Sequence, residues 1–157
     1  YEEHERNSSP RNRKEQIERL LANSGPIDVE SIIVASISES KPIILYFTGY
    51  NCINCRKIEE SVIKDETVLD ILDDYFVFVS LYVDDRSALD THEVITVNGE
   101  VKTVGELNLL FQMSEFETSS QPYFVALDPD GKILGSTNYI DSRTSSDFIE
   151  FLDKISD

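Results

Sequence analysis

The residues best suited to chemistry in this sequence are its only two cysteines, Cys52 and Cys55. Their C-x-x-C spacing places both sulfur atoms on one face of a helix, close enough to form a bond. A buried-strand pattern ends just before them and helix-forming residues follow, so we expect Cys52 in the first turn of a helix. The unpaired N–H groups of that turn stabilise a thiolate, which is the reactive form of a cysteine.

Thiol–disulfide exchange is the chemistry that this pair predicts. Cys52, the more exposed thiol, would attack a substrate disulfide and form a mixed disulfide. Cys55 would then attack Cys52 and release the reduced substrate, and the reverse steps would oxidise a dithiol. Arg56 and Lys57 follow the pair directly and would add positive potential beside it. This chemistry requires no metal and no organic cofactor, and we expect none.

Two structural roles are the alternatives for the cysteine pair: half of a metal site, or two small core residues. Cysteines this close cannot join distant parts of the chain, which excludes a framework of structural disulfides. A structural zinc site needs four ligands, and the only histidines, His4 and His92, form no second paired motif. The turn Gly49-Tyr50-Asn51 argues against a core position, because it predicts an exposed connection before Cys52.

The elements on either side of the pair must position it. The apolar run from Pro42 to Phe47 predicts a buried strand, and a helix is expected from Cys52 to about Lys64. A second helix over residues 67–73 and a strand over residues 76–83 follow. The nearly continuous apolar run of that strand predicts a central position in a sheet. The strand–helix–strand order is typical of an α/β domain.

The remaining sequence extends this domain in both directions. Towards the C-terminus we expect an Asn98-Gly99 hairpin between residues 94–97 and 101–104, a helix over 106–116, strands over 123–127 and 132–136 joined by a tight turn at 128–131, and an amphipathic helix over 142–155. Towards the N-terminus we expect helices over 11–22 and 28–37, separated by a break at 23–26. The predicted organisation is an N-terminal linker and helical extension, residues 1–26, and one domain, residues 27–157.

The charge of the chain is strongly negative and unevenly distributed. The net charge is −16, and all of it lies in residues 27–157, because the charges of residues 1–26 balance. This acidity argues against partners that are nucleic acids or anionic lipids. It serves solubility or, alternatively, steers a basic partner to the domain. No apolar run approaches the ~18 residues of a membrane span, and residues 1–14 lack the apolar stretch of a signal peptide.

Gln121-Pro122, directly before the strand over residues 123–127, is a second motif. A proline at the start of a strand is either an ordinary device of an edge strand or a cis proline held in a turn. The sequence leaves the isomer open.

These motifs together resemble the thioredoxin family over residues 27–157. The resemblance is carried by Cys52-Ile53-Asn54-Cys55 at a strand-to-helix turn, by Gln121-Pro122 before a strand, and by the terminal hairpin and helix. Residues 41–59 (KPIILYFTGYNCINCRKIE) are most similar to the C-terminal periplasmic domain of DsbD-type thiol:disulfide interchange proteins, in versions from Bacteroidetes-like bacteria. The resemblance implies a thioredoxin fold with a mixed central sheet flanked by helices, and a hairpin inserted before the cis-proline strand.

The same resemblance implies roles for individual residues. Cys52 would be the nucleophile, Cys55 the resolving thiol, and Pro122 the cis proline facing the disulfide. The backbone of Gln121 would pair with substrate, and Tyr50 and Asn51 would contact substrate beside Cys52.

Two positions depart from the family pattern. Asn51 stands where Trp usually precedes the first cysteine, and Tyr46 stands where thioredoxins carry a buried acid that helps to deprotonate the resolving cysteine. Glu59, one turn after Cys55, either replaces that acid or belongs to a solvated helix face. Tyr46, Glu59 and the two cations after Cys55 are therefore the candidates for tuning the pair. The connection over residues 84–120 is also longer than in a compact thioredoxin. It either extends one edge of the domain without a binding role or takes part in partner selection.

The leading hypothesis from the sequence is a protein-disulfide reductase that passes electrons to extracytoplasmic protein disulfides. The resemblance implies a periplasmic monomer whose electrons come from a membrane donor domain of the same chain. A disulfide oxidase or isomerase on the same fold is the second hypothesis, because the direction of exchange depends on the reduction potential. A non-catalytic thioredoxin-like binding module is the third.

Overall fold

The computed structural model describes residue 13 and residues 40–88 and 103–156. Its strands form one mixed sheet in the order β2-β1-β3-β4. β1 pairs with β2 in parallel and with β3 antiparallel, and β4 pairs antiparallel with β3. The strands are β1 (Ile43–Thr48), β2 (Val77–Tyr82), β3 (Tyr123–Leu127) and β4 (Ile133–Asn138), and the helices are α4 (Ile53–Ile58), a π-helical turn η1 (Glu59–Ile63), α5 (Glu66–Tyr75), α6 (Val104–Phe116) and α7 (Ser145–Ile155).

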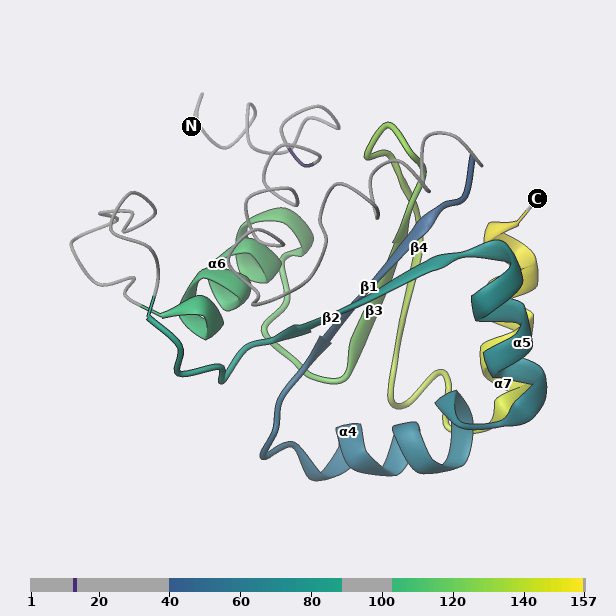
Figure 1. The fold of residues 1–157 in the computed structure, drawn as a ribbon, viewed down its shortest axis with the longest axis horizontal. Helices are drawn as coiled ribbons and strands as arrows, with labels where there is room; N and C mark the ends of the chain where they lie inside the picture. Colours follow the sequence, from purple (N-terminus) through teal and green to yellow (C-terminus); the bar gives the residue numbers. More distant parts are fainter. Residues whose placement is uncertain (1–12, 14–39, 89–102, 157) are drawn as a thin grey trace.

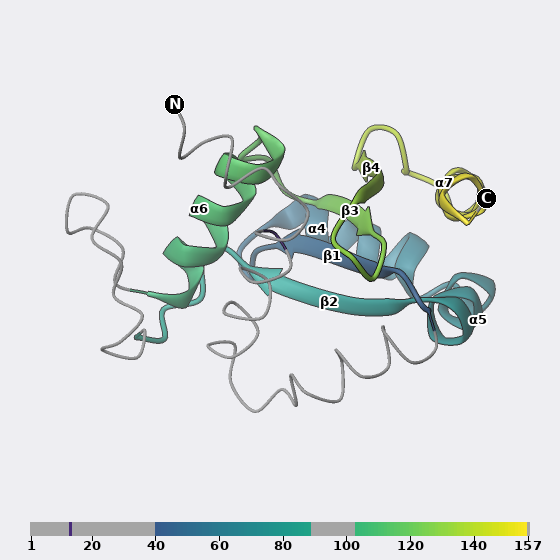
Figure 2. The same cartoon turned by 90° about the horizontal axis from the view of Figure 1, so that it is seen from above.

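Helices cover both faces of this sheet. One face packs against α6 through Val104, Leu107 and Phe111, and the other face packs against α4, η1, α5 and α7. Figure 1 shows α6 on one side of the sheet and α5 and α7 on the other, and Figure 2 gives the same arrangement from above. The mixed sheet between helices confirms the predicted thioredoxin fold class.

The centre of the sheet is formed by β1 and β3, not by β2. Ile44 to Phe47 in β1 and Phe124 to Leu127 in β3 are at most 2% exposed, because helices cover both of their faces. In β2 only alternate residues are buried. The prediction of a central position for residues 76–83 was therefore wrong for the described part of the sheet, where β2 is an outer strand.

Side-chain caps explain where the helices begin. Asp65 accepts hydrogen bonds from the N–H groups of Thr67 and Val68, so α5 begins directly after it, between the two helices expected to about Lys64 and over residues 67–73. α7 begins three residues later than expected, because Thr144 caps it by accepting from the Asp147 N–H over 3.1 Å. Ser142 is instead buried, with its hydroxyl 2.6 Å from that of Thr137.

Some expected features lie outside the described residues. These are residues 94–102 of the expected hairpin with its Asn98-Gly99 turn, the two N-terminal helices apart from Arg13, and the boundary near residue 26. The end of the hairpin's second strand is described, and the prediction was wrong there, because Thr103 caps α6 and Val104 is its first residue. Arg13 is described: its Nε donates to the Gly131 carbonyl over 2.9 Å, and its guanidinium is 3.4 Å from the Glu115 carboxylate. Across the described ranges, no helix has the length and apolar character needed to cross a bilayer.

Candidate active site

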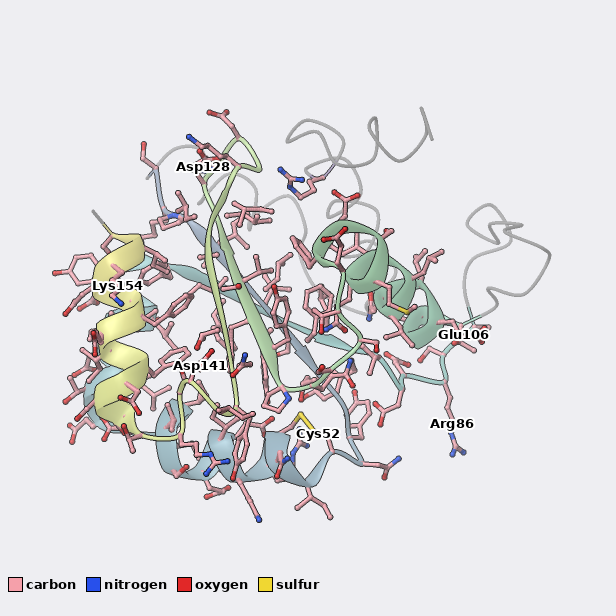
Figure 3. All side chains as sticks on the ribbon, turned by 180° about the vertical axis from the view of Figure 1, so that it is seen from behind. Cys52, Arg86, Glu106, Asp128, Asp141 and Lys154 are labelled. Atoms are coloured by element: carbon pink, nitrogen blue, oxygen red, sulfur yellow. A yellow bond between two sulfur atoms is a disulfide. The ribbon has the colours of Figure 1, made fainter. Side chains whose placement is uncertain are left out.

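The cysteine pair lies at the edge of the sheet where β1 ends and β3 begins. β1 ends at Thr48, and the turn that follows leads into α4. Figure 3 shows the bond between the two sulfur atoms at the beginning of α4, beside the ends of these strands. The strand-to-helix turn expected from the sequence is therefore present.

Cys52 and Cys55 form a disulfide, with their Cα atoms 5.2 Å apart. Cys52 is the N-cap of α4, and its Sγ accepts a 3.2 Å hydrogen bond from the backbone N–H of Cys55. Cys52 is half-buried, whereas Cys55 is fully buried. A group approaching from outside would therefore meet Cys52 first, and its sulfur has a backbone donor that favours negative charge.

Gln121 and Pro122 lie opposite Cys52. The peptide bond between them is cis, and Pro122 is buried. The carbonyl oxygen of Gln121 is 3.8 Å from the Sγ atom of Cys52. The structure thus brings together the two motifs that the sequence places 69 residues apart.

Asp84 holds the turn that precedes Cys52. Its carboxylate accepts hydrogen bonds from the backbone N–H groups of Tyr50 (2.9 Å) and Asn51 (3.1 Å). The sequence analysis did not single out this residue, which falls at the start of the connection over residues 84–120. The available signal was its position just after β2, because parallel strands such as β1 and β2 present their carboxyl ends at the same edge.

Tyr50 and Asn51, the predicted substrate contacts, are both exposed beside the disulfide. The Tyr50 ring is 56% exposed and stacks on Tyr82, with ring centroids 4.0 Å apart. Partial burial raises the pKa of Tyr50, and the nearby Tyr82, Asp85 and Asp84 add to that rise. The exposed stack gives the rim of the site a flat aromatic surface with acidic neighbours.

Polar side chains form a cluster behind the disulfide, centred on Glu59. The Tyr46 hydroxyl donates to Glu59 Oε2 over 2.7 Å, and Arg56 donates to the same oxygen over 2.7 Å. The Thr48 hydroxyl is 3.5 Å from that oxygen and accepts from Arg56 over 3.2 Å. The Glu59 side chain is only 24% exposed, so it belongs to this cluster and not to a solvated helix face.

The residues proposed to tune the cysteine pair therefore fall into two groups, those in contact behind Cys55 and one that is not. Tyr46 is 2% exposed, and its hydroxyl is also 3.5 Å from the carbonyl oxygen of Cys55. Burial raises the pKa of Tyr46, and Glu59 raises it further while Thr48 lowers it. Tyr46, Arg56 and Glu59 thus meet directly behind Cys55. Lys57 is exposed on α4, and in the described part of the chain no side-chain hydrogen bond or ion pair joins it to them.

Two buried amides on α6 donate to backbone carbonyl groups of neighbouring segments. Asn108 is 1% exposed and donates to the Tyr82 carbonyl over 3.0 Å. Gln112 is fully buried and donates to the Ser120 carbonyl over 2.8 Å. The sequence analysis did not identify either residue, because a single amide within an apolar helix has no local signature.

The arrangement supports exchange between the Cys52–Cys55 pair and an incoming thiol or disulfide. Cys52 has the exposure and the backbone donor that a nucleophile needs, and the buried Cys55 is already bonded to it. Among the described residues, no group of three or more His, Cys, Asp or Glu side chains is placed to hold a metal ion.

The sequence of this chain is similar to a family model and to one curated relative. A family model described as a thioredoxin-like domain matches residues 29–153. The methylamine utilization protein MauD of Methylophilus methylotrophus is 31% identical over 116 residues, which cover 73% of this chain and 51% of MauD. The chain therefore spans about half the length of this curated relative.

Three solved structures share the fold. The DsbH oxidoreductase superposes with a TM-score of 0.61 and 15% identity, over 81% of each chain. A disulphide isomerase from Xylella fastidiosa Temecula1 has a TM-score of 0.57 and 18% identity, over 87% of this chain and 98% of its own. A thioredoxin from Thermus thermophilus has a TM-score of 0.55 and 22% identity, over 81% and 82%. At these identities the similarity establishes the fold alone.

Proposed function

Because the chain belongs to the thioredoxin-like family, we propose that it is a protein-disulfide reductase whose electrons leave through Cys52 and Cys55. The exchange is supported by the asymmetry of the pair, and the direction of electron flow rests on the resemblance of residues 41–59 to DsbD-type domains. Cys52 is half-buried at the N-cap of α4, and Cys55 is fully buried behind it. One sulfur is therefore accessible to a substrate, and the other is accessible only to its partner.

The exchange proceeds from the reduced pair. The Cys52 thiolate attacks one sulfur of the substrate disulfide, and the other substrate sulfur leaves as a thiolate. The Cys55 thiolate then attacks Cys52 Sγ, the intrachain disulfide forms and the second substrate sulfur is released. The substrate gains two electrons, and the domain ends in the disulfide state that the structure shows.

The polypeptide of the substrate would lie along the backbone of Gln121. Its carbonyl oxygen, 3.8 Å from Cys52 Sγ, is near enough to pair with an N–H group of a chain whose cysteine is bonded to Cys52. Pro122 closes this edge, and the exposed Tyr50 and Asn51 face the same approach. These residues form the proposed substrate contact.

The Glu59 cluster is the proposed tuning element. The Glu59 carboxylate, held by Tyr46 and Arg56 behind Cys55, would take the place of the buried acid that thioredoxins carry where this chain has Tyr46. Its fixed charge would set the relative stability of the thiolate and disulfide states of the pair. The remote Lys57 would add only a weak, solvent-screened contribution.

A trapping experiment tests the exchange. In Cys55→Ser the mixed disulfide on Cys52 cannot be resolved, so the variant should capture protein partners under oxidising conditions. Cys52→Ser is the matched control and should capture far fewer, because Cys55 is fully buried. The wild type should reduce insulin in the presence of dithiothreitol. No captured partner and no insulin reduction would leave only a non-catalytic binding module.

The direction of electron flow is tested by the reduction potential of the pair. Equilibration with glutathione should give a value well below that of strong oxidants, which is about −120 mV. A reduction potential near that of the strong oxidants would indicate that the domain is an oxidase and not a reductase.

The source of electrons follows from the resemblance of residues 41–59 to DsbD-type domains. We place the domain in the periplasm as a monomer that receives electrons from a membrane donor domain of the same chain. A coding sequence without membrane spans on either side of this segment would contradict a donor in the same chain. Light scattering of the purified domain tests the monomer.

A further inference from the structure

The loop that carries Gln121 is fastened to α6 by one buried side chain, Gln112. α6 ends at Phe116, and Glu117 turns the chain back with a left-handed backbone (φ 57°). Gln112 Nε2 then donates to the Ser120 carbonyl over 2.8 Å, and Gln112 Oε1 accepts from Gln121 Nε2 over 2.8 Å. Both polar groups of this amide therefore bond to the two residues directly before Pro122.

The burial of Gln112 makes these bonds costly to lose. The residue is 0% exposed, among the buried residues of α6, which include the polar Asn108 and Glu115 as well as apolar side chains. A buried amide or carbonyl without a partner costs more than the bond itself contributes, since water cannot replace the missing partner. Gln121 adds a further hydrogen bond by donating to the Ser119 carbonyl over 2.9 Å. The loop is thus held in one conformation by α6 and by its own backbone.

This conformation determines where the Gln121 carbonyl points. The backbone carbonyl that follows the one bonded to Gln112 is that of Gln121, 3.8 Å from Cys52 Sγ. Building on the proposed exchange at Cys52, we propose that Gln112 is a positioning residue that fixes the Gln121 carbonyl for pairing with a polypeptide substrate. Gln112 itself touches neither the substrate nor the sulfur atoms. It acts by presenting an ordered backbone edge, so the entropy of ordering the loop is not lost on binding.

The proposal separates two classes of substrate. A protein disulfide has a backbone that can pair with Gln121, whereas bis(hydroxyethyl) disulfide has no peptide group. Loss of the Gln112 contacts should weaken binding of the first class and leave the second unaffected. A merely structural role in α6 would affect both classes alike, or neither.

Gln112→Met tests this with side-chain volume nearly retained and both hydrogen bonds removed. We expect KM for insulin to rise about five-fold, the effect of one lost hydrogen bond, with kcat nearly unchanged. The rate with bis(hydroxyethyl) disulfide should stay at the wild-type value. Asn108→Leu is the matched control, since it removes another buried amide from α6 that donates to the Tyr82 carbonyl. Its ratio of insulin to small-disulfide activity should remain that of the wild type.

Two results would overturn the proposal. One is an unchanged KM for insulin in Gln112→Met, and the other is an equal rise of KM in Asn108→Leu. If Gln112→Met does not fold, Gln121→Met is tested instead. The side chain of Gln121 is partly exposed, so it can be replaced without opening the core. This variant loses the bonds to Gln112 and Ser119 and should raise KM in the same direction, and an unchanged KM would again refute positioning.

The failure of this inference is distinguishable from failure of the proposed function. A wild-type protein that reduces neither substrate would remove the exchange function, and the positioning role with it. A wild-type protein that reduces both, alongside a Gln112→Met variant with the same KM for insulin, would remove the positioning role alone.

Discussion

Replacing Tyr46 by Phe would remove one hydrogen bond behind the cysteine pair and leave the packing of the ring in place. The Tyr46 ring is 2% exposed and stacks on Phe124, with centroids 4.5 Å apart and planes within 5°. Phenylalanine retains this stack. What is lost is the 2.7 Å bond from the hydroxyl to Glu59 Oε2.

The expected magnitude follows from the surroundings of Glu59. Hydrogen bonds to charged groups contribute ~1.5–3 kcal/mol to stability. Glu59 keeps its 2.7 Å bond from Arg56, and its side chain is 24% exposed, so Arg56 and water compensate part of the loss. We therefore expect the free energy of unfolding of Tyr46→Phe to fall by ~1.5 kcal/mol. For a domain of this size the melting temperature should fall by ~3–6 °C.

Urea unfolding of the oxidised domain, followed by circular dichroism, measures this difference. Tyr75→Phe is the control, because Tyr75 is 63% exposed and the loss of its hydroxyl should change stability by less than ~0.5 kcal/mol. If Tyr46→Phe were as stable as the control, the hydroxyl would contribute nothing and Arg56 alone would hold Glu59. A loss above ~4 kcal/mol would instead indicate a rearranged core.

Three further changes test other parts of the site. Asp84→Ala should lower the free energy of unfolding by ~1–2 kcal/mol and speed hydrogen exchange at the amides of Tyr50 and Asn51, which lose their acceptor; unchanged exchange would contradict the role of Asp84 in holding the turn. Gly105→Ala should destabilise the domain by ~1–3 kcal/mol in urea, since a Cβ there would lie 2.6 Å from backbone atoms that follow β2; wild-type stability would show that this segment moves aside freely. Burial raises the pKa of Tyr46 above its usual 10.0, so the folded state holds the phenol proton more tightly than the unfolded chain. The contribution of the Tyr46 phenol to the free energy of unfolding is full below pH ~10 and is lost as the pH rises further. The free energy of unfolding should therefore fall at alkaline pH, and it should fall less in Tyr46→Phe. An equal fall in both proteins would exclude Tyr46 as its source.

Much of the fold could be predicted because its signals are local. β1 is a short apolar run rich in β-branched residues, and α7 has apolar residues at helical spacing, so each is recognisable within its own segment. The reactive pair is likewise a local motif, in which three residues of separation and the preceding strand suffice. The position of β2 was not predictable in the same way, because an apolar run records burial but not the identity of the neighbouring strands.

The polar contacts of the site depended on the tertiary structure. Asp84 meets Tyr50 across 34 residues of sequence, and the Gln121 carbonyl meets Cys52 across 69. Such contacts leave no periodic pattern, because a carboxylate or an amide in a loop has the same local sequence whether it binds water or a backbone group. Glu59 shows this most directly, since helical spacing allowed both a solvated face and a buried partner, and only the tertiary packing of α4 and η1 brings it to Tyr46 in β1.

The sequence by itself therefore determined the reactive atoms, since the C-x-x-C spacing and the turn before it are short-range features of the chain. The tertiary structure alone decided what surrounds them: Asp84 on the turn, the Glu59 cluster behind Cys55, and Gln112 beneath the loop of Gln121. The physical reason is that a buried polar group must find a partner somewhere in the fold, and the chain brings that partner from whichever element lies nearest in space.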